Sequence, residues 1–462
     1  MPSRRQFLGT LAASCALPRV LHATGPAPLR LRAAPSRARI APAGYPETDL
    51  WTFNGTMPGE ELRLRQGERL RAELVNDLPQ PTSVHWHGIR IDNAMDGVPG
   101  LTQDPVMPGE RFSYEFDLPD AGTYWYHSHA QTVEQVERGL YGALIVEESD
   151  PPDVDADLVL VVDDMRLDRD AAITFDFDAP HDRSHAGRIG NAWLVNGQMD
   201  PRQKVRRGDR LRLRLINAAN ARVYVLGLMG MTGWTVALDG MPLAAPEPLE
   251  EQFLLAPAQR MDVIVDVTTD EAEAFLISLE RDGGYAIATF DVDPGGAARG
   301  TAPAALPPNP GFPIDLANAR TVPLLMEGGA MGGMSGAVLD GERQDMRGLA
   351  QQNVFWAFNG TVGRMGDYGI GDPLIEVDRG ESVRIGIAND TAFDHAMHLH
   401  GMHFAEVRSD GSLGPLRDTL LVQRGETREI AFAAHNPGDW LFHCHMLAHH
   451  AAGMGTWLRV RG

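Results

Sequence analysis

Residues 193–217 read WLVNGQMDPRQKVRRGDRLRLRLIN, and the end of this stretch alternates between charged and apolar side chains. Alternation with a period of two places every second residue on one face, which is typical of a half-buried β-strand. The Asn-Gly pair at Asn196 predicts a tight turn ahead of that strand. The stretch therefore favours a β protein over a helical one.

Related stretches begin at Trp51 and Phe355, so the pattern occurs three times in the chain. Each copy has an Asn-Gly turn, a Gly-acid pair and an alternating strand that ends in Asn, with nine residues from that Gly to that Asn. Fixed internal spacing indicates a duplicated domain. Because short strands alternate with Gly, Pro and Asn turns, we expect all-β units, either β-sandwiches or Greek-key barrels.

The three copies suggest the domain boundaries. We place the units at residues 40–150, 151–295 and 320–462, with a Pro-, Gly- and Ala-rich linker at 296–319. Only the outer two units carry a Gly five residues before a His-x-His motif. We therefore expect the middle unit to supply no metal ligands and to act as a spacer.

The N-terminus predicts export. An arginine pair (Arg4, Arg5) precedes a short apolar run, which resembles a twin-arginine signal peptide over residues 1–23 and a periplasmic destination. No later stretch reaches the roughly 18 apolar residues that a membrane helix needs. The net charge of −21 argues against nucleic acid as a partner and would attract cations.

Cleavage near Ala23 would remove Cys15 and leave Cys444 alone in an oxidising compartment, where metal ligation would explain a lone thiol. Ten of the sixteen histidines fall in four short clusters. The clusters contain His85 and His87; His127 and His129; His395, His398 and His400; and His443, His445 and His449. On a strand, residues i and i+2 share a face, so each His-x-His pair aims two imidazoles one way. Four pairs, divided between the outer units, predict a metal cluster where those units meet.

Residues 443–454 read HCHMLAHHAAGM. Cys444 lies between His443 and His445, so its side chain points to the opposite face of the strand and serves a second site. With His395 and His449 it offers two imidazoles and a thiolate, and Met454 can add a weak axial thioether. This is the ligand set of a blue-copper electron-transfer centre. Structural zinc sites, the rival interpretation, favour CxxC-type spacing, which the sequence lacks.

The motifs HxHG, HxH, HxxHxHG and HCHxxxHxxxGM together resemble those of three-domain multicopper oxidases, the superfamily of laccases, bilirubin oxidases and bacterial copper-efflux oxidases. The resemblance covers essentially the whole mature chain and implies cupredoxin-like Greek-key β-sandwich domains with four coppers. The implied ligands are His395, Cys444, His449 and Met454 for a type 1 copper, His85 and His398 for a type 2 copper, and His87, His127 and His445 with His129, His400 and His443 for a type 3 pair. In this family, electrons enter singly at the type 1 copper, and the trinuclear cluster reduces dioxygen to water.

Reduction of dioxygen consumes protons, so an acid is expected near the cluster. Asp96, nine residues after His87, resembles the proton-relay position of the family; the alternative is a surface turn aspartate, and Asp92 is a weaker candidate. Many relatives carry a second acid directly after the last type 1 histidine. Here that position is His450.

The reducing substrate is predicted from residues 324–346, where Met326, Met331, Met334 and Met346 stand among glycines. Thioethers are soft ligands that select cuprous ion, and the segment resembles a short version of the methionine-rich insertion of copper-efflux oxidases. We predict a periplasmic cuprous oxidase of copper tolerance, with laccase-type oxidation of phenols as the alternative.

Two classes of non-enzymatic protein are alternatives to the oxidase. A copper carrier would need only the type 1 ligands and would leave eight histidines unexplained. Multicopper-like structural factors in cell division have lost ligands, whereas every implied ligand is present in this chain. The motifs therefore favour the enzyme, with dioxygen as its acceptor.

Overall fold

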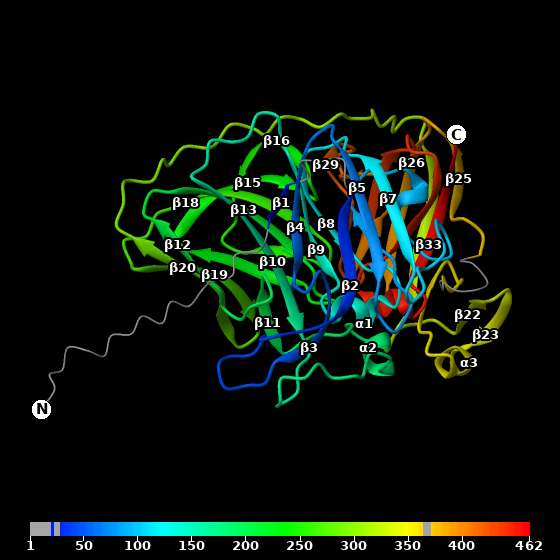
Figure 1. Cartoon of the computed structure of the whole chain (residues 1–462). Coiled ribbons are helices and arrows are strands. Elements are labelled where there is room, and N and C mark those ends of the chain that lie inside the picture. Colours follow the sequence, from blue (N-terminus) through cyan, green and yellow to red (C-terminus); the bar gives the residue numbers. More distant parts are fainter. Residues whose placement is uncertain (1–19, 23–27, 364–370) are drawn as a thin grey trace, which may run out of the picture.

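The computed structural model describes residues 20–22, 28–363 and 371–462 (Figure 1). Arg4, Arg5, Cys15 and Ala23 of the predicted signal peptide lie outside the described residues. Within the described part of the chain, no helix is both long enough and apolar enough to cross a bilayer.

The first unit packs two sheets face to face. In spatial order, one sheet holds β1 (Val20–His22), β4 (Gly59–Arg65), β9 (Tyr141–Glu147), β8 (Gly122–His127) and β6 (His85–His87). The other holds β3 (Thr48–Phe53), β2 (Leu29–Ala38), β5 (Arg69–Asn76) and β7 (Arg111–Asp117). Two short helices, η1 (Asn93–Met95) and α1 (Thr132–Glu137), interrupt its connections. Because β2 pairs within this unit, the unit starts before residue 40.

The middle unit repeats the two-sheet arrangement and includes one helix, α2 (Pro180–Ser184). One sheet holds β11 (Ala192–Val195), β10 (Ala156–Met165), β13 (Arg210–Asn217), β18 (Arg260–Val267), β15 (Met231–Leu238) and β16 (Met241–Pro248). The other holds β12 (Arg202–Arg206), β20 (Gly283–Asp293), β19 (Glu273–Glu280), β14 (Tyr224–Met229) and β17 (Phe253–Leu255).

The third unit has the same plan, with two helices, α3 (Met346–Gln351) and α4 (Leu447–Ala451). One sheet holds β24 (Trp356–Phe358), β21 (Arg320–Gly328), β26 (Ser382–Asp390), β31 (Thr427–Ala433), β28 (Phe404–Val407) and β29 (Leu413–Arg417). The other holds β25 (Ile375–Asp378), β33 (Gly455–Arg461), β32 (Gly438–Cys444), β27 (His395–Leu399) and β30 (Thr419–Val422). A hairpin of β22 (Gly336–Leu339) and β23 (Glu342–Asp345) stands apart.

The three units use the same local chemistry. In each, the turn asparagine and the following glycine both have positive φ, as a type I′ turn requires. The side chain of that asparagine also bonds the backbone of an early strand of the unit: Asn54 contacts Arg30 and Arg32 on β2, and its counterparts repeat the contact on β10 and β21. The predicted all-β architecture of three cupredoxin-like domains is confirmed.

Strand β13 differs from the expected half-buried strand, because both of its faces are buried. Its leucines face the core of the middle unit. Its arginines are paired with carboxylates: Arg210 with Asp266, and Arg212 and Arg214 with Asp262. Such pairing lowers the desolvation penalty that otherwise keeps arginine at the surface.

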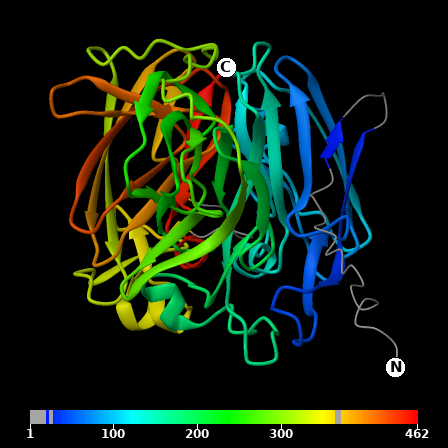
Figure 2. The same cartoon turned by 90° about the vertical axis from the view of Figure 1, so that its left-hand side faces the viewer.

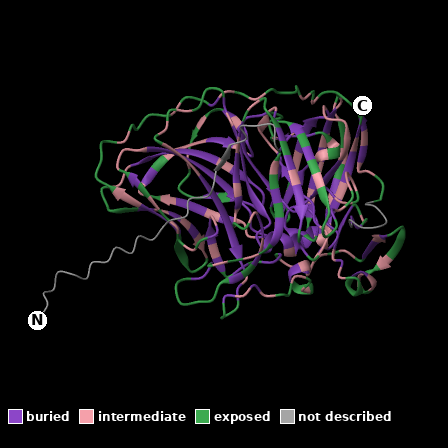
Figure 3. Ribbon diagram, in the orientation of Figure 1, coloured by how far each residue is buried: buried purple, intermediate pink, exposed green. Residues whose placement is uncertain are grey.

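The first and third units lie side by side, and the middle unit packs against both (Figures 1 and 2). One continuous hydrophobic cluster includes Trp86 and Tyr124 of the first unit with Trp440 and Phe442 of the third. Buried strands run through this shared interior (Figure 3). The linker has no helix or strand, and its Asn309 bonds the backbone of Ala121. The strand ends that carry the His-x-His motifs therefore meet at an interface fixed by packing.

Candidate copper centres

The His-x-His motifs lie at the ends of paired strands. In the first unit, β6 is antiparallel to β8 and His85 stands opposite His127. In the third unit, β27 is antiparallel to β32 and His398 stands opposite His443. The repeated antiparallel pairing therefore delivers two pairs of imidazoles from each outer unit to one place.

Eight buried imidazoles converge between the outer units. Their ring nitrogens form three groups in which the candidate ligand atoms lie within 4.8 Å of one another. The groups are His85, His87 and His398; His87, His127 and His445; and His129, His400 and His443. All three groups combine histidines from both outer units, and none of the metal-ligand groups found among the described residues draws on the middle unit.

These imidazoles fit a bound metal. Several ring nitrogens are fully buried without a hydrogen-bond partner, including Nε2 of His85, Nδ1 of His87 and Nε2 of His398. Burial lowers the pKa of His127, His129 and their neighbours well below the ordinary value, so the rings are in the neutral, ligating form. Unpartnered buried nitrogens are otherwise unfavourable, and metal ligation would satisfy them.

A second group occupies the opposite face of β32. The Sγ atom of Cys444 lies 3.6 Å from Nδ1 of His395 and 3.8 Å from Nδ1 of His449, and the two nitrogens are 3.2 Å apart. Met454 is fully buried, and its backbone bonds Cys444 and His449. Burial raises the pKa of the Cys444 thiol to about 12, so a cation is needed to stabilise its thiolate. Cys444 is covalently flanked by His443 and His445, which directly links this group to the histidine cluster.

The middle unit covers the Cys444 group. Nε2 of His449 donates to the backbone carbonyl of His185, directly after α2, at 2.6 Å. The indole of Trp356, which packs on His449, donates to the carbonyl of Arg183 in α2. The ring of His395 is held by Thr391, at 2.8 Å. This contact could not be predicted from the sequence, because nothing local marks a backbone carbonyl as a partner.

Asp96 lies at the histidine cluster rather than at the surface. Its side chain is fully buried at the end of η1, and Oδ2 is 3.0 Å from Nδ1 of His400. Its backbone carbonyl accepts from Nδ1 of His85, at 2.8 Å. Asp92, the weaker candidate, is exposed. The carboxyl of Asp96 is therefore placed to exchange a proton with the cluster, and His450 lies nearby with its ring 4.3 Å from that of His443.

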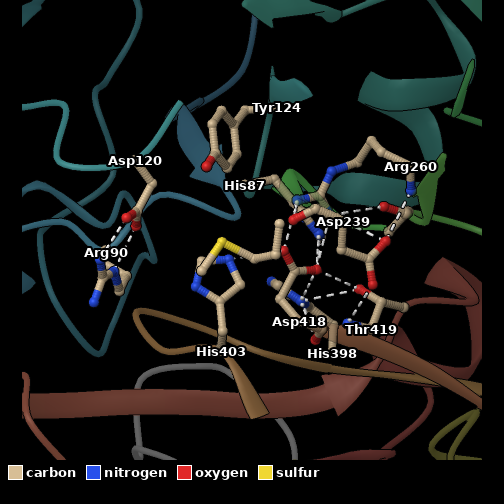
Figure 4. A network of polar contacts seen from close by, with 12 residues as sticks. His87, Arg90, Asp120, Tyr124, Asp239, Arg260, His398, His403, Asp418 and Thr419 are labelled. Atoms are coloured by element: carbon tan, nitrogen blue, oxygen red, sulfur yellow. Dashed lines mark hydrogen bonds and ion pairs between the residues drawn. The ribbon is translucent and has the colours of Figure 1, made fainter. Parts of the chain in front are cut away.

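A second buried acid, Asp418, was missed (Figure 4). Its Oδ1 contacts Nε2 of His87 at 3.2 Å, and its backbone carbonyl accepts from Nδ1 of His398 at 3.0 Å. Arg260 of β18 donates to both carboxylate oxygens, at 2.8 and 2.6 Å. Burial alone would raise the pKa of Asp418, but the charge of Arg260 outweighs it and holds that pKa well below its usual range.

Asp418 thus stays ionised and orients two of the cluster imidazoles. Arg260 also donates to the carbonyls of Thr123 in the first unit and Asp239 in the middle unit. The middle unit is therefore more than the expected spacer, since its guanidinium joins residues of all three units (Figure 4). No spacing in the sequence could reveal this, because Arg260 and Asp418 are 158 residues apart.

The four methionines proposed as substrate ligands differ in burial. Met326 is fully buried in β21, and Met334 and Met346 pack against a small core near α3. Met331 is 82% exposed, in a loop whose Ala330 N–H donates to the Ser184 carbonyl of α2 at 2.7 Å. Of the four, Met331 is the most exposed to a soluble ion.

Profiles described as multicopper oxidase match residues 36–151, 160–295 and 342–462. A solved structure of Lac15 from a marine microbial metagenome is 43% identical, with a TM-score of 0.76, over 94% of this chain and 100% of that one. A multicopper oxidase structure from Pseudomonas thermotolerans is 32% identical, with a TM-score of 0.82, over 96% and 100%.

Curated relatives agree with these structures. Multicopper oxidase MmcO of Mycobacterium tuberculosis is 29% identical over 91% of this chain and 85% of its own length. More distantly, copper resistance protein A of Pseudomonas syringae pv. tomato is 26% identical over 88% and 89%. The profiles, the solved structures and the buried histidine groups point to one conclusion: the chain belongs to the multicopper oxidase family and is an O2-reducing oxidoreductase.

Proposed function

We propose that the chain holds four coppers and couples the periplasmic oxidation of cuprous ion to the reduction of dioxygen. The observation that supports the copper count most strongly is the division of buried ligands into histidine groups on one face of β32 and a cysteine group on the other. In the proposal, His395, Cys444, His449 and Met454 hold the type 1 copper, and His85 and His398 hold the type 2 copper. The two groups His87, His127, His445 and His129, His400, His443 hold the type 3 pair.

Copper bound at these sites would supply one-electron redox chemistry between a reductant and dioxygen. The protein's own contribution is positional. Asp418 keeps His87 and His398 in one orientation, the backbone carbonyl of His185 fixes His449, and Oδ2 of Asp96 lies 3.0 Å from Nδ1 of His400, where a proton can pass between the two side chains. Burial keeps bulk water away from the cluster.

Cuprous ion is proposed as the reductant for three reasons. Met331 offers an exposed soft ligand near the Cys444 group, the net charge of −21 attracts cations, and one relative is named copper resistance protein A. Export of the chain to the periplasm by its arginine-pair signal belongs to the same proposal, since copper tolerance is needed there. Separation of periplasm from cytoplasm and detection of the processed chain tests the location.

A specific observation favours phenols as the second candidate. A surface cavity of about 770 Å³ lies beside the Cys444 group, lined by Phe393 and Met446 and rimmed by Arg222 and Arg424. A cavity of this size can admit one aromatic ring. Ile189→Trp, which adds bulk at its rim, should raise the KM for a phenol and leave that for cuprous ion unchanged if phenols bind there.

Copper analysis combined with oxygen uptake tests the proposal. Four coppers per chain and dioxygen consumption with cuprous ion are expected. One copper per chain without oxygen uptake would indicate a carrier, and faster turnover with phenols than with cuprous ion would favour the laccase-type alternative.

A further inference from the structure

Two histidines stand four residues apart at the surface of the middle unit, directly over the Cys444 group. His181 lies in α2 and His185 directly follows it. Their rings are parallel, with centroids 4.0 Å apart and an interplanar angle of 11°. The side chain of His181 is 77% exposed, and that of His185 is half-buried. Histidines spaced i, i+4 on one turn are neighbours on one face and can share a metal ion.

The ring of His185 is oriented by its surroundings. Its Nδ1 lies 3.0 Å from Oγ of Ser184 and 3.1 Å from the carbonyl of His181. Its Nε2 has no hydrogen-bond partner among the described residues, and the edge of Phe393 packs nearby with centroids 5.7 Å apart. One nitrogen of the ring is therefore anchored and the other is available to a ligand.

Met331, in the loop tied to α2, is the candidate for a third donor. The N–H of Ala330 donates to the Ser184 carbonyl at 2.7 Å, and the N–H of Gly329 donates to Phe355, so the loop is tied to α2 and to the third unit. Met331 itself has a φ of 65°, an uncommon conformation for a residue with a Cβ, and its side chain is exposed. Because the thioether is exposed, packing does not explain why this residue is methionine.

The chemistry of these donors is specific. Imidazole binds several first-row metals, but a thioether is a soft donor that favours monovalent copper over zinc or cupric ion. Two imidazoles and one thioether would satisfy the low coordination number of a cuprous ion. The site also lies next to the Cys444 group, which would accept the electron. The backbone carbonyl of His185 accepts a hydrogen bond from Nε2 of His449 at 2.6 Å.

We propose that His181, His185 and Met331 form the docking site of the cuprous substrate, and that its electron leaves through the His185 peptide to His449. This rests on the proposed cuprous oxidase activity and keeps only Met331 of the four methionines, because Met326 is fully buried and Met334 and Met346 pack against a small core. Each cuprous ion becomes cupric by giving up one electron. Four such electrons with four protons convert one dioxygen to two waters, the acceptor reaction of the family.

The test uses the full copper-loaded protein and silver ion, a redox-inert mimic of cuprous ion. Calorimetric titration with Ag⁺ compares the parent with His181→Gln, Met331→Leu and the double variant. Met229→Leu is the matched control, because Met229 is also exposed (54%) but lies on β14. Loss of one ligand should weaken one Ag⁺ site at least about tenfold, and loss of both should abolish it, while the control binds as the parent does.

Steady-state kinetics with cuprous ion completes the test. The KM for cuprous ion should rise about tenfold or more in the double variant, in parallel with the lost Ag⁺ affinity. Ag⁺ binding that is unchanged in the double variant, or lost without any change in that KM, overturns the docking site while leaving a cuprous oxidase intact. If the parent protein binds Ag⁺ at these residues but oxidises no cuprous ion, the proposed function itself fails.

Discussion

Cys444 joins the two groups of ligands, because its backbone neighbours belong to the histidine cluster and its own side chain to the other face of β32. In the buried apo site its pKa is raised to about 12, so the thiol ionises only when a cation takes the place of its proton. Metal loading of this site should therefore release a proton and become weaker as the pH falls.

Cys444→Ser should abolish the intense visible absorption, because the colour of such a centre arises from charge transfer between thiolate and copper. Serine is similar in size, so the fold should survive and copper should remain in the histidine cluster. Visible absorption, copper analysis and circular dichroism measure the three effects. A variant that stayed blue would show that the colour arises elsewhere.

Asp96→Asn should leave copper content and colour unchanged but slow the reoxidation of the reduced protein by dioxygen about a hundredfold, since an amide cannot release a proton. The carboxyl lies 3.0 Å from His400, so its loss acts at the cluster. Asp92→Asn is the matched control, because Asp92 is exposed four residues earlier. Stopped-flow reoxidation at several pH values measures the rate, and equal rates in both variants would assign Asp96 a purely structural role.

At the level of single residues, the sequence predicts the candidate ligands but few of the residues that orient them. A His-x-His motif is visible because strand geometry turns spacing into direction, and all twelve candidate ligands are buried in the structure. Asp418 and Arg260 carry no such signal: each is an ordinary charged residue until tertiary packing buries both. Burial of charge depends on long-range contacts, which local spacing does not encode.

At the level of elements, alternation predicts strands but not what covers their polar face. The RLRLRLI segment forms β13 as expected, yet its arginines are buried against carboxylates of three other segments. The turns were easier to predict, since Asn-Gly at a hairpin has few alternatives to positive φ.

Arg212→Leu tests the buried ion pairs of the β13 arginines. It leaves Glu148 without its closest cation and removes one of two partners of Asp262, so the free energy of unfolding should fall by about 3 to 5 kcal/mol. Arg202→Leu is the control: Arg202 pairs with Glu273 and Asp291 at the surface, and its loss should change stability little. Chemical unfolding monitored by fluorescence compares the two. Equal losses of stability in the two variants would show that the buried ion pairs of Arg212 contribute no more than the surface pairs of Arg202.

His403, directly before β28, should make the stability of the fold depend on pH. His403 is buried with both ring nitrogens unpartnered, and burial lowers its pKa to about 3. As the pH falls below about 6.5, the unfolded chain takes up a proton that the folded chain excludes, so stability is lost towards acid, by about 3 kcal/mol at pH 4. His403→Phe should remove that part of the acid loss from the apo protein. Chemical unfolding at pH 7 and pH 4 measures it, and parallel losses in parent and variant would contradict the assignment.

At the level of the whole molecule, the outer units supply the ligands and the middle unit completes their surroundings. Its His185 carbonyl holds His449, and its Arg260 holds Asp418 between His87 and His398 (Figure 4). The three related units therefore divide into two that carry the candidate metal ligands and one that orients those residues. The number of units could be predicted from the repeats, whereas this division of labour depends on how the units dock.

Arg260→Gln tests the role of the middle unit. Without the guanidinium, the buried Asp418 loses two charge-assisted hydrogen bonds and no longer fixes His87 and His398. We expect selective loss of the copper assigned to His85 and His398, while the blue colour of the Cys444 centre remains, because that centre lies on the other face of β32. Arg260→Lys keeps the charge and should restore part of the lost copper.

Arg210→Gln provides the decisive control for Arg260. Arg210 is also a buried arginine of the middle unit, but its partner Asp266 bonds the N–H of Gly300 rather than a cluster histidine. Its loss should destabilise the fold without selectively emptying one copper site. Copper per chain and the paramagnetic resonance spectrum of the type 2 copper distinguish the two variants, because general destabilisation alters neither spectrum nor occupancy selectively. If both variants lose copper alike, Arg260 contributes stability alone; if only Arg260→Gln does so and lysine restores the spectrum, the middle unit orients the cluster through Asp418.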